Sequence, residues 1–445
     1  MKPAQEAGTI TAALAEVLPW LWSAADDLPA PVRLRTHRLW TDTAACAWSG
    51  LRAEPCQRWL ALQAETDPGP VVLPGTDVRL GVGAGAFAFA MGACWDEACE
   101  GVAIAHGRPG VPIVAALWSQ VGLVKPSWGQ LWRATAVGYE VGARLGARLR
   151  IRAGQHVDGM WGAFGASAAL ACLQGLSWQD ALCALETCAV QLPYSLYQPI
   201  AQGANVRNMY LGHSTWLALQ AVQAVRSGYT SPVGAIDEFA RLALDTSNAV
   251  ALEPAGRWWI LDSYWKPYAG VRHLHYGAQA AIRLREQVTD ITAVEALRLH
   301  IYPEAQFYCG NRNPQTALAA QFSLSFGVAA ALVFGDLSPA EYGPARFQDP
   351  RLRRLEALLE VQPDPVMFPG SQRGARLEAL VRGQWLGVAQ AQVLGDPGHE
   401  PDANALARKF TRYTQGDAAM AAWSKSLHGD PFWAAVNWPD NNLRR

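Results

Sequence analysis

The chain has 445 residues, of which half are hydrophobic and 17% are charged. This composition excludes a disordered or fibrous protein, and the length predicts two or three domains. The 37 basic and 38 acidic side chains give a net charge of −1, and no basic stripe with interleaved aromatic residues is visible. We therefore expect no nucleic-acid partner.

The cysteines and the first residues bear on the cellular compartment. None of the eight cysteines forms a Cys-x-x-Cys pair, which argues against a zinc ribbon, a redox motif or an iron–sulfur cluster. The N-terminal residues contain no apolar core of signal-peptide length. The longest uncharged stretch, 159–179, is rich in small residues and contains two glutamines, so we interpret it as an interior helix and not as a membrane span. We expect a cytoplasmic protein with no membrane partner.

The first 260 residues are predicted to be helical almost throughout. Apolar residues recur at three- and four-residue intervals over 7–18 and 131–149, as on amphipathic helices. The segments 165–173 and 216–225 are nearly continuous runs of small or aliphatic residues, which indicates buried helices. We assign residues 1–260 to a large helical domain.

The pattern changes near Trp258. Residues 295–301 and 376–381 alternate polar and apolar side chains, and the second run is followed by Arg-Gly-Gln and then by 385–393, a hairpin pattern. Residues 316–334 return to helical apolar sequence. These elements predict an α+β domain over residues 261–396.

Helices are predicted again after the Gly-Asp-Pro-Gly turn at 395–398, over 403–413 and 418–427. We expect the terminal segment 397–445 to pack back on the first domain. The predicted fold is mainly α, with a large all-helical domain built from both chain ends and a smaller α+β lid. A cleft would separate the two.

Two segments combine histidine with groups that attract anions. Residues 154–159 place His156 and Asp158 ahead of a glycine-rich helix start, where backbone N–H groups suit an anionic ligand. The alternative is a capping loop whose histidine binds only the backbone. Residues 266–275 contain Lys266, Arg272 and His275, a mixture that could bind a polycarboxylate. The alternative is a solvated turn that leads into a helix starting near Gly277.

Two further segments carry candidate residues. Cys94-Trp95-Asp96-Glu97, followed by His106, could do acid–base work, although the spacing fits neither a zinc-protease helix nor a calcium loop. An exposed acidic turn is the alternative. Arg207 lies in nearly uncharged sequence and is either a structural ion-pair partner or an anion clamp. There is no G-x-S-x-G motif and no Walker loop, so serine hydrolysis and phosphoryl transfer lack motif support.

Four motifs in the same order resemble the MmgE/PrpD family, which includes 2-methylcitrate dehydratase, cis-aconitate decarboxylase and iminodisuccinate epimerase. Residues 138–146 look like the family's G-Y-E-V-x-x-R-L-G. Residues 154–165 look like its G-F-H-x-T-G-x-x-G-x-x-G, with Asp158 in place of the usual Thr. Residues 266–275 are similar to its K-P-Y-x-x-C-R-x-x-H, and 311–324 to its N-R-x-P…F-S-L. The resemblance covers about residues 80 to 413.

The chain also departs from the family pattern. The family's D-F-D-D-T-H falls on residues 94–99, where Cys94 replaces an acidic residue thought to matter for catalysis and Ala98 replaces the Thr. The usual K-R-L-H-A-G falls on residues 207–212, where Arg207 keeps the positive charge. Phe326 stands where the family has a Tyr, so a phenol proton donor is missing there. Carboxylate recognition looks retained, while the acid–base groups look altered.

The resemblance implies a cleft site between a helical domain and a lid, a homodimer, a small carboxylate substrate and no metal or organic cofactor. We expect a lyase of the 2-methylcitrate dehydratase type that moves a proton next to a carboxylate of a small (poly)carboxylic acid. Alternatives are an epimerase-like isomerase, a decarboxylase, a recruited biosynthetic cyclase or dehydratase, and a catalytically disabled binding protein. The expected proton-transfer residues are His156, His106, Asp96 and His275, and the expected substrate-binding residues are Arg207, Lys266, Arg272, Asp158 and Cys94.

Overall fold

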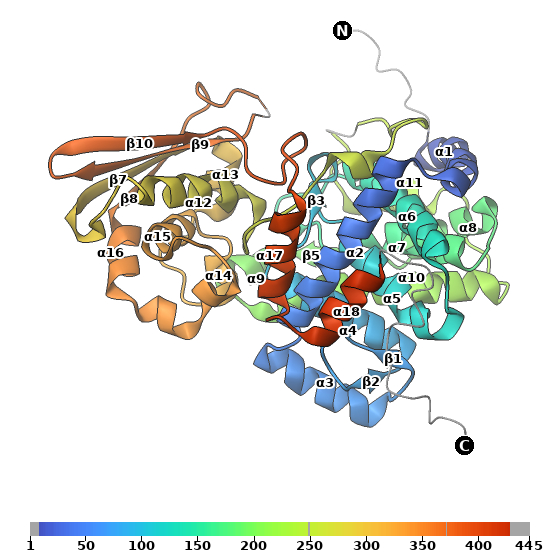
Figure 1. Ribbon diagram of the computed structural model, residues 1–445. Helices are drawn as coiled ribbons and strands as arrows, with labels where there is room; N and C mark the ends of the chain where they lie inside the picture. The colour runs from blue at the N-terminus through green and yellow to red at the C-terminus, as the bar shows by residue number, and fades with distance from the viewer. Residues whose placement is uncertain (1–8, 248–249, 371, 428–445) are drawn as a thin grey trace, which may run out of the picture.

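The computed structural model describes residues 9–247, 250–370 and 372–427, which fold into two lobes (Figure 1). The start of the predicted helix over 7–18 and the end of the predicted terminal segment, 428–445, lie outside the described residues. We call α1–α11 together with α17 and α18 the helical body, and α12–α16 together with β7–β10 the lid. The predicted class, mainly helical with a small sheet in the C-terminal region, is confirmed.

Helices make up most of the helical body. Their bounds are α1 Ile10–Ala24, α2 Ala30–Gly50, α3 Glu54–Thr66, α4 Val82–Trp95, α5 Gly110–Val124, α6 Trp128–Arg148, α7 Gly162–Leu173, α8 Trp178–Ala189, α9 Gln198–Gln202, α10 Tyr210–Arg226, α11 Ala235–Ala243, α17 Ala403–Tyr413 and α18 Ala418–Ser426. Among the described residues, no helix is long and apolar enough to cross a membrane.

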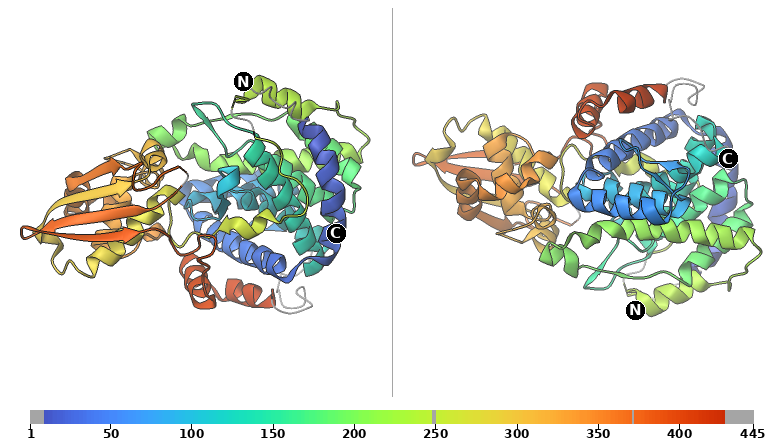
Figure 2. Two further views of the ribbon diagram at one scale, coloured as in Figure 1. Left: turned by 90° about the horizontal axis from the view of Figure 1, so that it is seen from above. Right: turned by 90° about the horizontal axis from the view of Figure 1, so that it is seen from below.

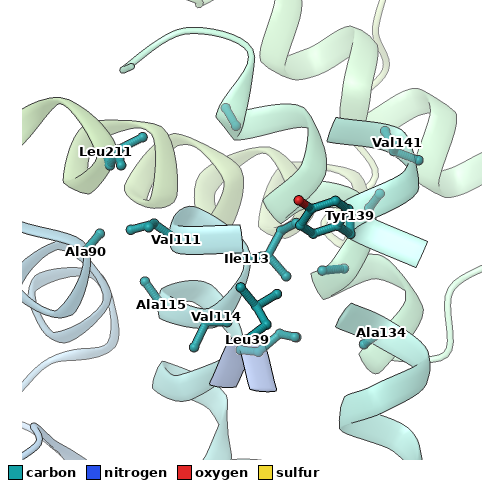
Figure 3. Close-up of a cluster of buried hydrophobic side chains, with 14 of the residues drawn as sticks. Leu39, Ala90, Val111, Ile113, Val114, Ala115, Ala134, Tyr139, Val141 and Leu211 are labelled. Atoms are coloured by element: carbon teal, nitrogen blue, oxygen red, sulfur yellow. The ribbon is translucent and has the colours of Figure 1, made fainter. Parts of the chain in front are cut away.

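The centre of the helical body is the small-residue helix α7, every residue of which is buried. It contacts α5, α6, α8 and α10. The approach of α6 to α7 depends on glycine, because a Cβ on Gly138 would lie 2.6 Å from the carbonyl oxygen of Gly165. Figure 3 shows part of this core, where side chains of α2, α4, α5, α6 and α10 meet around Ile113 and Tyr139. The interior helix predicted for 159–179 is therefore confirmed over residues 162–173, while the chain turns after Leu173 and α8 begins at Trp178.

Three two-residue ladders interrupt the helices, although the sequence predicts helix almost throughout this part. They are β1 Val71–Val72 with β2 Arg79–Leu80, β3 Gly101–Val102 with β6 Ser263–Tyr264, and β4 Gln155–His156 with β5 Ser195–Leu196. Strands this short leave no alternation in the sequence. Two of the ladders fix the loops that carry His156 and Tyr264.

The lid is a four-stranded mixed sheet in the order β10-β9-β7-β8. Only β7 and β8 run parallel. The helices α12 and α15 contact each other, and α12 also contacts β9 and β10. The bounds are α12 Arg272–Arg285, β7 Val294–Ile301, α13 Pro303–Cys309, α14 Ala317–Ala320, α15 Leu324–Phe334, α16 Pro350–Leu358, β8 Leu359–Pro363, β9 Ala375–Val381 and β10 Gln384–Gln390.

The predicted hairpin is confirmed as β9–β10, and positive φ angles at both turn residues, Arg382 and Gly383, match a type I′ turn. The predicted helix over 316–334 is broken at residues 321–323. Ser323 caps the second part, since its hydroxyl accepts the backbone N–H of Phe326. The sequence does not predict β8, which has five residues and follows α16 directly.

Two chain segments cross between the lobes side by side. The backbone N–H of Trp265 donates to the carbonyl of Gly395 over 2.9 Å. Gly395 has φ +92°, and a Cβ there would lie 2.3 Å from the Trp265 carbonyl oxygen, so only glycine fits. One large apolar core contains residues from 10–260 and 413–427, and a second contains residues from 268–393. The domain boundaries at 260 and 396 stay predictions.

The helices α17 and α18 lie against the helical body, beside α2 in both views of Figure 2. Lys409 of α17 is buried and pairs with Asp42 of α2 at 2.6 Å. It also donates to the carbonyl of Ala98 over 2.8 Å. Asp42 accepts the indole N–H of Trp265 over 2.8 Å. One buried cation thus connects α2, the loop after α4 and the crossing to the lid.

Replacing Lys409 with Met is expected to lower the free energy of unfolding by about 3–5 kcal/mol, because Asp42 would remain as a buried, unpaired charge. Urea unfolding followed by tryptophan fluorescence measures this. The control is Lys425→Met at an exposed position of α18, where we expect less than about 0.5 kcal/mol. Equal effects of the two variants would contradict a structural role for the Lys409–Asp42 pair.

Candidate active site

A cavity of about 360 Å³ lies where the helical body and the lid meet. Ionisable side chains dominate the polar part of its lining, and cations outnumber carboxylates. The lining contains the cations Arg108, Arg150, Arg207, Lys266, Arg272 and Arg373, the carboxylates Glu97, Asp158, Asp245 and Glu304, and the imidazoles His106, His156 and His273.

Five of these side chains form one buried network, which we call the inner charge cluster: Glu97, Asp158, Arg108, Arg207 and Lys266. Both guanidinium groups pair with both carboxylates: Arg207 lies 2.6 Å from Glu97 and 3.0 Å from Asp158, while Arg108 lies 3.0 Å from Glu97 and also pairs with Asp158. The Lys266 ammonium lies 3.0 Å from the Glu97 carboxylate and donates to its backbone carbonyl over 2.7 Å. All five are nearly inaccessible to solvent.

The neighbouring cations lower the pKa values of the two carboxylates, Glu97 and Asp158. Burial alone would raise the pKa of Glu97, but the charges of Arg108, Arg207 and Lys266 hold it well below its usual value. Burial is likewise opposed at Asp158, where Arg108 and Arg207 lower the pKa. Burial lowers the pKa of Lys266, although Glu97 offsets part of this effect. Both carboxylates are therefore anionic and are weak bases.

Glu97 is held in an uncommon backbone conformation. The helix α4 ends at Trp95, and Glu97 in the following turn has φ +52°, a left-handed value that is costly for a side chain other than glycine. His106, also in the cavity lining, has the same φ of +52°. Backbone strain of this kind persists where surrounding contacts enforce it, and it concentrates at functional sites.

His156 belongs to β4 in the short ladder β4–β5 and is buried in the cavity wall. Its Nδ1 atom accepts the backbone N–H of Asp158 over 3.0 Å. Burial lowers the pKa of His156 to about 4, so the ring is neutral at pH 7. With Nδ1 acting as an acceptor, the ring proton is assigned to Nε2. His156 therefore offers the cavity a neutral hydrogen-bond donor.

The other two imidazoles of the cavity are neutral as well. Burial, followed by the charges of Arg150 and Arg373, lowers the pKa of His106 to about 4. Burial holds the pKa of His273 well below its usual value. The Nδ1 atom of His273 lies 2.7 Å from the Tyr302 hydroxyl, and its ring stacks on Tyr308 with centroids 5.6 Å apart. When Tyr302 accepts that hydrogen bond, Nε2 of His273 is free to take up a proton.

Six of the nine predicted site residues line this one cavity: His156, His106, Asp158, Arg207, Lys266 and Arg272. Cys94 is buried behind it, where its sulfur accepts from Arg207 at 3.0 Å and from Arg108 at 3.1 Å. Arg272 also pairs with Asp396 and donates to the carbonyl of Trp265 over 3.3 Å. Positions far apart in the sequence thus come together as expected.

Asp96 and His275, two of the predicted proton-transfer residues, are not among the lining residues. The carboxylate of Asp96 accepts from Ser49 over 2.6 Å, and burial raises its pKa to about 6. His275 is completely buried, with Nε2 3.2 Å from the carbonyl of Gly270. The helix α12 begins at Arg272, so the solvated turn considered as the alternative, with a helix starting near Gly277, is wrong. On α12 the histidine that lines the cavity is His273 and not His275.

Sequence reasoning did not select several lining residues as site residues. Glu97 was part of the segment that could do acid–base work, and His273 stood inside a quoted motif, but neighbouring residues were selected instead. Arg108 lies two positions after His106, and no motif in the sequence includes it. Arg373 precedes β9 in a loop, where no periodicity marks it. Burial of Glu97 among three cations is a tertiary property that one sequence does not display.

Within the described residues, no three or more His, Cys, Asp or Glu side chains are grouped so that they could hold a metal ion. The polar side chains converge instead on a cavity of a size suited to a small ligand.

A helical body, an α+β lid and a cavity between them that is lined by more cations than carboxylates define a two-lobed protein. The chain matches the MmgE/PrpD N-terminal domain over residues 22–245 and the MmgE/PrpD C-terminal domain over residues 268–422, so it belongs to the MmgE/PrpD family. This family includes dehydratases, decarboxylases and epimerases that act on carboxylic acids, and its members are generally enzymes. None of the curated proteins compared with the chain matches it.

Proposed function

We propose that the protein is a lyase of the dehydratase type that moves a proton next to a carboxylate of a small polycarboxylic acid. One observation carries this proposal: six cations and three neutral imidazoles line a single cavity between the lobes of an MmgE/PrpD family member. Removal of a C–H proton beside a carboxylate creates an enolate-like centre. Fixed cations in a site screened from water stabilise that charge strongly.

The geometry supports different roles for the three imidazoles. His156 donates from Nε2 and is suited to hold a carboxylate or enolate oxygen, since its Nδ1 atom is occupied by the Asp158 N–H. His273 is a candidate proton acceptor on its geometry, because its ring is fixed by Tyr302 and Tyr308, although its lowered pKa makes it a weak base before substrate binds. His106 is the second candidate acceptor. The inner charge cluster holds the carboxylates Glu97 and Asp158 as counter-ions and not as bases.

Dehydration also needs a proton for the departing hydroxyl group. Phe326, which replaces a family Tyr, is buried in the lid and stacks with Tyr342 and Phe347. The cavity lining nevertheless includes other phenols, among them Tyr264, whose ring lies 4.9 Å from the Arg272 guanidinium carbon. Burial raises the pKa of Tyr264 to about 12, so it stays protonated at pH 7. We propose Tyr264 as the proton donor.

Incubation of the protein with hydroxylated and unsaturated di- and tricarboxylic acids in D2O, followed by proton NMR, tests the proposal. A lyase forms or hydrates an alkene. An isomerase exchanges a C–H proton for deuterium without water loss, a decarboxylase releases CO2, and a cyclase closes a ring. Formation or hydration of an alkene by loss or addition of water supports the proposal, and each of the other three outcomes replaces it with the respective alternative.

Binding is measured separately by thermal shift. A carboxylate present at 100 times its dissociation constant stabilises the native state by about 2.7 kcal/mol. Binding without turnover by any of these reactions would favour a disabled binding protein. The homodimer stays a prediction, which light scattering coupled to size-exclusion chromatography tests.

A further inference from the structure

The cations of the cavity differ in how far their charge is already balanced. In the inner charge cluster, Arg108 and Arg207 each pair with Glu97 and Asp158, and Lys266 pairs with Glu97. Arg272 pairs with Asp396. These four cations are the ones bound most closely by the protein's own carboxylates. A substrate carboxylate would have to compete with those pairs.

Arg150 and Arg373 are different. No ion pair involving Arg150 occurs among the described residues, and burial lowers its pKa without an opposing carboxylate. Arg373 reaches Glu304 only at 3.4 Å, near the long end of hydrogen-bond distances. Both line the same cavity, and the charges of both lower the pKa of His106. The two guanidinium groups therefore lie near one imidazole with unused hydrogen-bonding capacity.

This part of the cavity is distinct from the inner charge cluster. The ion pairs of the inner charge cluster connect Glu97 and Asp158 with Arg108, Arg207 and Lys266 and do not involve the charges of Arg150 and Arg373, which lower the pKa of His106. The two sets share no member. The cavity therefore has two poles. At the one beside His106, Arg373 pairs with Glu304 alone, and no ion pair of Arg150 occurs among the described residues.

We propose that Arg150 and Arg373, together with His106, form an outer anion subsite that binds a second carboxylate of the substrate. The inference rests on the proposed function and assigns the substrate to compounds with at least two carboxylates held at separate poles. A guanidinium group binds a carboxylate in a planar, bidentate manner, which gives the subsite its specificity.

The subsite joins the two lobes. Arg150 follows α6 in the helical body, and its backbone pairs with that of Asp245 in an isolated bridge. Arg373 belongs to the lid, immediately ahead of β9. A carboxylate that contacts both guanidinium groups would bridge the body and the lid.

Calorimetric titration of the full chain with citrate, succinate and acetate tests the subsite. The variants are Arg150→Gln and Arg373→Gln, with Arg152→Gln and Arg376→Gln as controls at exposed neighbouring positions. We expect the wild type to bind citrate or succinate more tightly than acetate. Each cavity variant should weaken that binding by about tenfold or more, since one charge-assisted contact is lost, while the controls stay within about twofold.

The outcomes separate the two proposals. If the wild type binds citrate or succinate and both cavity variants bind it equally well, the outer anion subsite is overturned and the proposed function stands. If the wild type neither binds nor converts any polycarboxylate, both the proposed function and the outer anion subsite are overturned. Circular dichroism checks folding, and Arg150→Lys and Arg373→Lys, which keep the charge, should retain more affinity than the glutamine variants.

Discussion

Replacing His156 with Ala is expected to lower kcat by about 10²–10³-fold, with KM changed far less, because the variant loses a donor aimed at charge that develops in the transition state. His156→Gln separates two roles of the ring. A glutamine amide can donate a hydrogen bond but is no base, so it should recover part of the activity if His156 acts as a donor. If His156 acts as the base, the Gln and Ala variants should be equally slow.

His213→Gln is the matched control, since His213 is exposed on α10 and stacks with Trp216 outside the cavity lining. We expect its kcat to stay within about twofold of the wild type. Steady-state kinetics on whichever carboxylic acid is converted supplies the measurement. Unchanged kcat in His156→Ala would remove His156 from the chemistry and leave the division of roles among the imidazoles without support.

More of the fold than of the candidate site can be predicted from the sequence. The small-residue run 162–173 is buried on all sides and could be recognised as an interior helix from composition alone. The alternation in 376–381 and the Gly at 383 predict the β9–β10 hairpin. These are local patterns of period and turn chemistry. The two-residue ladder that carries His156 has no such pattern, because its pairing with Ser195 is purely tertiary.

The site illustrates the same limit. Motifs place His156, Arg207 and Lys266 in one cavity, since their spacing belongs to a family order. They do not show that Glu97 neutralises Lys266 and Arg207, because ion pairing depends on three segments meeting. The family motif selected His275, whereas on α12, which begins at Arg272, His273 is the histidine that lines the cavity. Helix boundaries predicted from a single sequence are uncertain by about two to four residues, so the direction of side chains near a helix start cannot be predicted.

The second large effect is expected at Glu97, which pairs with three buried cations. Replacing Glu97 with Gln leaves these cations with one buried carboxylate, and we expect a loss of about 3–5 kcal/mol in the free energy of unfolding at pH 7. Urea unfolding followed by tryptophan fluorescence measures it. Glu54→Gln is the control, because its pair with Arg58 is exposed and should contribute less than about 1 kcal/mol.

The pH dependence of this difference identifies its electrostatic origin. The pKa of Glu97 lies well below its usual value of 4.5 in the folded chain, so the stability that it contributes is fully present above the unfolded-state pKa. That stability is lost as the pH falls below about 4.5 toward the folded pKa. The wild type and Glu97→Gln should therefore differ most near pH 7 and converge in acid. A difference that is constant from pH 7 to pH 3 would indicate altered packing at residue 97 and not the loss of a buried anion. Citrate should also stabilise the variant more than the wild type, since the uncompensated cations would then attract an external carboxylate.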